Sequence, residues 1–62
     1  MSDHKLFNCS EEYEVNYVAN LYTESKRVKE FLIEQCKNGT IKNFTHAEVY
    51  ALIKAKLGLL RK

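Results

Sequence analysis

The clearest helix signal in the chain is Phe44-Thr45-His46-Ala47-Glu48-Val49. Thr45 at the N-cap and Glu48 three residues later form a capping box, in which each side chain satisfies a backbone N–H group of the other residue. Phe44 and Val49 occupy the two positions of the hydrophobic staple, the apolar contact that accompanies such a box. Local sequence therefore predicts that a helix begins immediately after Thr45.

Apolar residues continue this helix at spacings of three or four as far as Leu57. Gly58 then supplies a stop, because glycine adopts the left-handed conformation at little cost. The predicted helix spans about 46–57. His46, at its first position, is expected on the surface, where the positive end of the helix dipole disfavours a protonated ring.

Two more helices are predicted upstream from the same kind of pattern. Ser10 precedes a run of glutamates that suits the positive end of a helix dipole, and predicts a helix over about 11–22 with Ser10 as its N-cap. Ser25, with Thr23 as the alternative, is expected to be the N-cap of a second stripe, which ends at Asn38-Gly39 and predicts a helix over about 26–37. Residues at helical spacing are Tyr13, Tyr17, Val18, Leu21 and Tyr22 in the first helix, and Val28, Phe31, Leu32 and Gln35 in the second.

Three short helices with short connectors predict a compact all-α three-helix domain. Sixty-two residues leave room for one domain, which we assign to 1–62 with an N-terminal arm over 1–9. The first two helices and the turn Thr23-Glu24-Ser25 form a helix-turn-helix-like pair, although that motif often has glycine in its turn. Residues 5–7 could also pair with residues 40–42 as extended chain, although two isolated strands are marginal in water.

Neither an enzyme site nor a cofactor site is predicted. A chain of 62 residues seldom encloses a cleft, and its two glycines, Gly39 and Gly58, cannot form a phosphate-cradling loop. The soft metal ligands match no metal-binding spacing; they are His4, Cys9, Cys36 and His46. Cys36 is interpreted as a small core residue. The sequence predicts a non-enzymatic binding module without cofactor or metal.

The sequence also predicts a cytoplasmic protein with no membrane partner. Its N-terminus, Met-Ser-Asp-His-Lys, lacks the apolar run of a secretory signal. No stretch approaches the roughly 18 apolar residues of a membrane span. In a reducing compartment, Cys9 and Cys36 are expected to stay reduced.

The total charge of +2 conceals an uneven distribution, with −4 over residues 1–24 and +6 over residues 25–62. Lys26 and Arg27 begin the second predicted helix, where the helix dipole opposes cations by roughly 0.3–1 kcal/mol each, so their placement suggests a function. A helix N-terminus with two cations suits a phosphate group, and double-stranded DNA is the first candidate partner. The predicted nucleic-acid-binding residues are Lys26, Arg27, Lys29, Lys54, Lys56, Arg61 and Lys62.

The same cations allow a second interpretation, in which they form an ordinary solvated face. Lys26 would then pair with Glu30 one turn later, and Glu24 would offset the remaining charge. The acidic and basic segments could equally be surfaces of one domain that attract each other. The sequence leaves these interpretations open.

An alternative function is protein interaction through an exposed tyrosine surface on the first helix. Tyr13, Tyr17 and Tyr22 lie on an apolar stripe that is broad for so small a monomer. Tyrosine is enriched at interfaces, so the stripe suggests an adaptor, a self-associating module or a homodimer. The competing interpretation is that at least two of the three tyrosines fill the core.

Three segments of the chain resemble a family of very small bacterial domains of unknown function. They are Glu12-Tyr13-Glu14-Val15-Asn16-Tyr17, Val28-Lys29-Glu30-Phe31-Leu32 and Val49-Tyr50-Ala51-Leu52. In that family a Glu-Val/Ile-x-Tyr/Phe opening precedes a helix-turn-helix-like pair and a short last helix. The resemblance covers about residues 9–58, and the link over 37–45 is longer here. It implies a helix-turn-helix-like fold and no particular activity.

Overall fold

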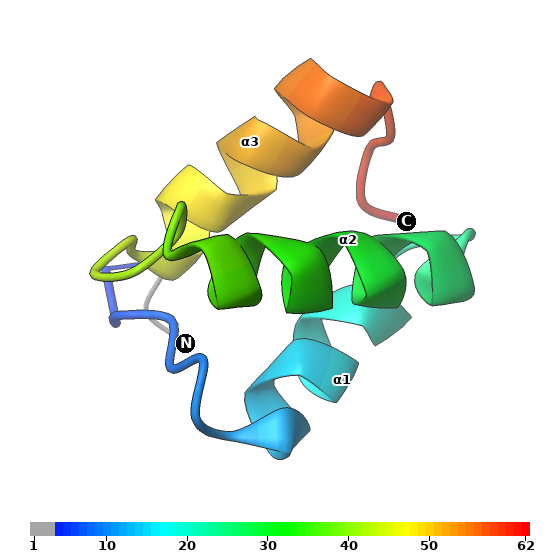
Figure 1. The fold of residues 1–62 in the computed structure, drawn as a ribbon. Helices are drawn as coiled ribbons and strands as arrows, with labels where there is room; N and C mark the ends of the chain where they lie inside the picture. The colour runs from blue at the N-terminus through cyan, green and yellow to red at the C-terminus, as the bar shows by residue number, and fades with distance from the viewer. Residues whose placement is uncertain (1–3) are drawn as a thin grey trace.

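Three helices form the fold of residues 4–62, which the computed structural model describes (Figure 1). They are α1 (Glu12–Asn20), α2 (Ser25–Asn38) and α3 (His46–Leu57). Within the described residues, extended pairing is confined to two isolated antiparallel bridges, Leu6 with Thr45 and Tyr22 with Arg61. The predicted all-α three-helix domain is confirmed, with residues 21–24 as the turn between α1 and α2.

The start of α3 and the ends of α2 and α3 agree with the sequence. Thr45 Oγ1 accepts a hydrogen bond from the Glu48 N–H at 3.2 Å, and the Glu48 carboxylate accepts one from the Thr45 N–H at 2.9 Å. Gly39 ends α2 at φ 74°, and Gly58 ends α3 at φ 69°. These signals act over a few residues of chain, so the rest of the fold does not override them.

The N-caps predicted for α1 and α2 are wrong. The N–H of Ser10 donates to Asn8 Oδ1 at 2.9 Å, so Ser10 belongs to a turn that precedes the helix. Glu11 is the residue before α1, and its side chain makes no capping hydrogen bond. Ser25 is the first residue of α2 and does not cap it. The predicted end of α1 at 22 is also too late, because Tyr22 leaves the helix to pair with Arg61.

Apolar side chains from every helix meet in one core. The buried apolar residues are Phe7, Val15, Val18, Ala19, Tyr22, Val28, Leu32, Ile41, Val49 and Ile53. Full burial of one large aliphatic or aromatic side chain stabilises a fold by roughly 1.5–3 kcal/mol. Phe7 lies outside the helices, so the core also holds the arm, which we define as residues 4–9.

The arm pairs with the start of α3. The Phe7 N–H donates to the Phe44 carbonyl at 2.8 Å, and the His46 N–H donates to the Lys5 carbonyl at 2.9 Å. The arm therefore pairs with residues 44–46, and not with residues 40–42, the segment that the sequence offered as a possible partner. Residues 41–43 form a turn, with Asn43 at φ 70°, and the chain that leaves this turn lies beside the arm.

A disulfide joins Cys9 of the arm to Cys36 of α2. The expectation of two reduced cysteines is wrong, because it rested on the inferred compartment and took no account of the distance between them. The fold places their Cα atoms 5.7 Å apart, which is the usual separation in a disulfide. The bridge spans 27 residues of sequence and encloses α1.

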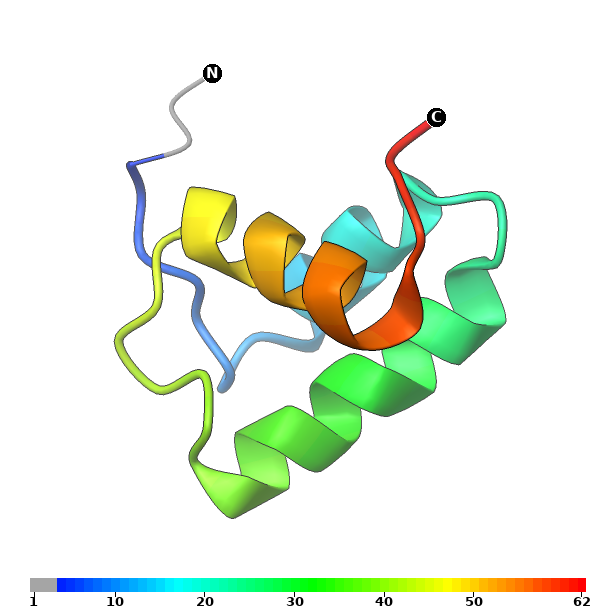
Figure 2. The same ribbon diagram turned by 90° about the horizontal axis from the view of Figure 1, so that it is seen from above.

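The C-terminal tail, residues 58–62, returns from α3 to the turn between α1 and α2 (Figures 1 and 2). The Lys62 N–H donates to the Leu21 carbonyl at 2.9 Å, next to the bridge between Tyr22 and Arg61. The end of α3, the tail and the start of α2 consequently lie at one end of the molecule. The arm lies at the other end in both views.

Candidate functional site

The seven predicted nucleic-acid-binding residues lie in two segments, 24–30 and 54–62, which we call the basic end. The basic end holds seven cationic and two anionic side chains. The tail lies beside the turn between α1 and α2, because Lys62 bonds to Leu21 and Arg61 pairs with Tyr22 (Figure 2). Cations from two segments that are at least 24 positions apart in sequence thus lie toward the same end of the fold.

The first turn of α2 carries the cations that the sequence singled out. Lys26 and Arg27 are exposed, and Lys29 is half-buried. Arg27 Nη1 lies 3.6 Å from Glu24 Oε1, and both side chains are more than half exposed, so this ion pair is weak. No ion pair joins Lys26 to Glu30 in the part of the chain that is described. Of the two pairings in the solvated-face interpretation, the described residues therefore show a contact of Glu24 with a cation and none between Lys26 and Glu30.

The tail adds a cation with a fixed position. The Arg61 guanidinium lies 4.3 Å from the centre of the Tyr50 ring, within the range of a cation–π interaction. Arg61 and Lys54 also line one small pocket with Tyr22 and Tyr50. Lys56 and Lys62 are also exposed.

The three tyrosines proposed as an interaction surface have separate environments. Tyr13 is 73% exposed, and its ring stacks on that of the half-buried Tyr17 at a centroid distance of 6.5 Å. Tyr22 is only 2% exposed, so its assignment to an exposed surface is wrong. Burial raises the pKa of the Tyr22 hydroxyl, with an opposing effect from Arg61 and a smaller raising effect from Tyr50. Tyr22 lies beyond the end of α1, and its side chain is part of the core.

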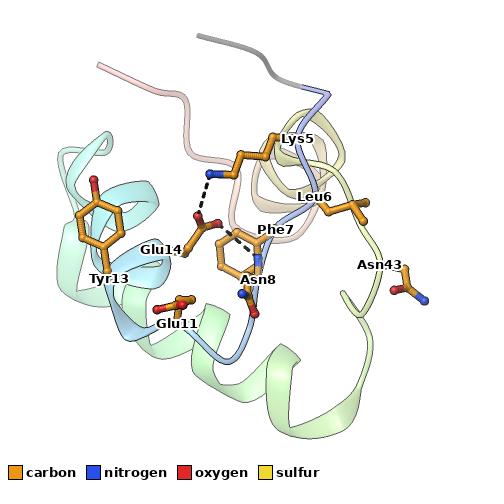
Figure 3. Close-up of a pocket in the computed structure, with 8 residues that line it drawn as sticks. All are labelled: Lys5, Leu6, Phe7, Asn8, Glu11, Tyr13, Glu14 and Asn43. Carbon is orange, nitrogen blue, oxygen red and sulfur yellow. Dashed lines mark hydrogen bonds and ion pairs between the residues drawn. The ribbon is translucent and has the colours of Figure 1, made fainter.

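A groove lies between the arm and α1, with a volume of about 720 Å³ (Figure 3). Its rim carries two large apolar side chains that remain exposed, Leu6 at 54% and Tyr13 at 73%. The lining residues are Lys5, Leu6, Phe7, Asn8, Glu11, Tyr13, Glu14 and Asn43. No pattern in the sequence indicates this groove, because its shape depends on the pairing of the arm with the start of α3.

Glu14 lies in the wall of the groove and binds three residues, two in the arm and one in α3. His46 Nε2 is 3.0 Å from Glu14 Oε1, the Asn8 N–H donates to the same oxygen at 3.3 Å, and Lys5 Nζ is 3.6 Å from Oε2. The side chains of Glu14 and His46 are each about one-tenth exposed. The expectation that His46 lies on the surface is therefore wrong. Glu14 and His46 are 32 positions apart, and no local pattern links them.

The pKa of Glu14 reflects these partners. Burial alone would raise the pKa of its carboxyl group. The hydrogen bonds from His46 and from the Asn8 backbone, together with the charges of His46 and Lys5, outweigh burial and hold the pKa below its ordinary value. An ionised Glu14 whose oxygens are already bound by the arm and α3 is suited to a structural role, and less to proton transfer.

Comparison of the chain with protein-family models finds no match, and searches of curated proteins and of solved structures also find none. The resemblance to small helix-turn-helix-like domains therefore stays a prediction. Over residues 4–62, no helix combines the length and the apolar character needed to cross a bilayer.

Proposed function

We propose that this chain is a small nucleic-acid-binding module whose basic end contacts the phosphates of double-stranded DNA. The observation that carries the proposal is the return of the tail, in which Lys62 bonds to Leu21 and Arg61 pairs with Tyr22. That contact adds the cations of residues 54–62 to those of the first turn of α2. Proteins that neutralise several phosphates release counterions and gain affinity from this clustering.

The arrangement suits phosphate contact in two further ways. The first turn of α2 presents exposed cations next to backbone N–H groups that have no partner within the helix, and such N–H groups bind anions. Arg61 is held against Tyr50, so less side-chain freedom is lost when its guanidinium meets a phosphate. In the helix-turn-helix-like interpretation, α2 is the second helix of the pair and approaches the major groove with this first turn.

Salt dependence of binding to a fluorescently labelled generic duplex tests the proposal. The logarithm of the association constant should fall linearly with the logarithm of the salt concentration, with a slope of about −0.9 for each phosphate neutralised. Fluorescence anisotropy over a range of salt concentrations measures the slope. No binding at low salt would overturn the proposal.

Charge reversal at the start of α2 locates the contact. Lys26→Glu/Arg27→Glu should weaken binding at least about tenfold and make the slope about two units shallower. The matched control is Lys37→Glu/Lys42→Glu, which changes net charge equally at the opposite end of α2 and should retain most of the affinity. Equal losses in the two variants would mean that overall charge, and not the basic end, drives binding. Circular dichroism checks that both variants keep their helices.

Protein interaction is a second candidate function, supported by the exposure of Tyr13 and Leu6 at the groove. The groove itself lies apart from the basic end, so it does not overlap the proposed DNA contacts.

A further inference from the structure

Large apolar side chains are exposed at four places among the described residues: Leu6, Tyr13, Ile33 and Leu60. Leu6 and Tyr13 lie on opposite sides of the groove, and the Leu6 side chain points away from Tyr13 (Figure 3). Leu60, at 67% exposure, lies in the tail next to Arg61 and Lys62. Exposed apolar groups that adjoin charged groups are typical of interaction surfaces.

The charges beside these apolar groups are opposite in sign. In the groove, Lys5 is paired with Glu14, which leaves Glu11 without a compensating cation among the lining residues. Glu12, also exposed, follows it in the chain. The side chains of the tail include two cations and no carboxylate. Groove and tail are therefore complementary in charge as well as in apolar character.

The backbone of the arm offers a further binding feature. The bridge to Thr45 uses the Lys5 carbonyl and the Phe7 N–H, which point to one side of the arm. Backbone groups alternate in direction along extended chain, so those of Leu6 point to the other side, as does the Asn8 N–H that donates to Glu14. The N–H and carbonyl of Leu6 make no hydrogen bond to any described residue. They can pair with an extended peptide laid in the groove.

We propose that the groove binds the tail of a second copy of this chain, with Leu60 against Tyr13, with the backbone of the tail beside that of Leu6 and with Lys62 beside Glu11. The arm and the tail lie at opposite ends of the molecule (Figure 1), so a chain cannot fill its own groove. The contact is consequently head to tail, in which each copy uses one surface as donor and a different one as acceptor. The inference does not depend on nucleic-acid binding.

Sedimentation velocity of two variants with opposite defects tests the proposal. Glu11→Lys/Tyr13→Ser damages the groove and keeps the tail, and Leu60→Ser/Lys62→Glu damages the tail and keeps the groove. Wild-type chain should self-associate at low salt and dissociate as salt rises. Each variant alone should associate at least about tenfold more weakly than wild type, because like charges now meet. An equimolar mixture should form a one-to-one complex and nothing longer, since one intact groove and one intact tail remain.

Matched controls lie on the outer face of α2. Ile33→Ser/Glu34→Lys removes an exposed apolar group and reverses an acid, and Ile33→Ser/Lys37→Glu does the same with a base. Both controls should associate like wild type. A wild-type chain that stays monomeric at low salt and high concentration would overturn the proposal. So would a tail variant that still self-associates, because that result would indicate a symmetric groove-to-groove contact.

A peptide titration keeps the proposal testable where a variant does not fold. An acetylated Leu-Leu-Arg-Lys peptide should shift the amide resonances of Leu6, Glu11 and Tyr13 in isotopically labelled wild-type chain. A peptide with serine and glutamate in place of the second leucine and the lysine should shift them at least about tenfold less at equal concentration. Equal shifts with the two peptides, or shifts elsewhere only, would count against the groove. The groove variant keeps its basic end, so its DNA affinity is an independent measurement that separates failure here from failure of the proposed function.

Discussion

Glu14 is the residue at which the arm, α1 and α3 converge. Its carboxylate accepts hydrogen bonds from Asn8 and His46 and lies near Lys5. Glu14 thus joins the arm to α3, and these two segments are distant from each other in sequence. Removing one partner from a buried pair leaves the other without compensation, which is more costly than the net value of the pair. Glu14 was expected only to complement the dipole of α1, and its principal role is to join elements.

The lowered pKa of Glu14 predicts a loss of stability in acid. Because the pKa of this carboxyl is lower in the folded chain than in the unfolded chain, the unfolded chain binds more protons between the two values. The stabilisation is present above the ordinary glutamate pKa, roughly 4.3, and is lost as pH falls through the lower folded value. Urea unfolding between about pH 7 and pH 3 measures the slope.

Glu14→Gln should flatten this pH dependence, because the amide can still accept hydrogen bonds but does not titrate. Glu12→Gln is the matched control, since Glu12 is exposed on the same helix turn and should leave the slope almost unchanged. A Glu14→Gln chain with the wild-type slope would show that another group governs the acid sensitivity.

Among the helices, the local sequence predicted the N-cap of α3 correctly and that of α1 incorrectly. Thr45 and Glu48 form their capping box because both lie within one turn, and no distant contact competes for them. Ser10 has a side chain of the right type at the right distance from α1, but its backbone is committed to a turn with Asn8. The arm and the disulfide at Cys9 determine the path of the chain at this point.

Alanine substitutions at Thr45 and Ser10 should distinguish a side chain that caps its helix from one that does not. Thr45→Ala should lower the free energy of unfolding by about 1 kcal/mol, within a usual range of roughly 0.5–2 kcal/mol for a lost N-cap. Ser10→Ala should change it by less than about 0.5 kcal/mol, as for other exposed positions. Urea denaturation of the two variants measures the difference. Equal losses would mean that Ser10 caps α1 in solution.

At the scale of the whole molecule, the disulfide adds stability to a fold whose hydrophobic core is small. A chain of this size buries only about 60% of the surface that the unfolded chain exposes. The Cys9–Cys36 bridge joins residues 27 positions apart in sequence, and the chain-entropy model assigns such a loop about 3.5 kcal/mol. Domains of this length are stable by roughly 3–9 kcal/mol, so the bridge supplies a large share.

Reduction should therefore shift the urea midpoint of the wild-type chain to clearly lower denaturant, by an amount equivalent to about 3.5 kcal/mol. Cys9→Ser/Cys36→Ser should unfold at the midpoint of the reduced wild type and should not respond to reductant. A thiol assay confirms that reduction is complete. An unchanged midpoint with both thiols titratable would show that the core and the arm contacts suffice.

The sequence by itself determined the three helices, the α3 capping box, and the glycine stops at Gly39 and Gly58, because these depend on propensity and contacts within one helical turn. It also identified the cations of the basic end, but not that they lie at one end of the molecule. Only the tertiary structure decided the burial of Tyr22 and His46, the partners of Glu14, the disulfide and the groove. Each of these depends on segments far apart in sequence, whose meeting follows from packing of the whole core and leaves no periodicity in the chain.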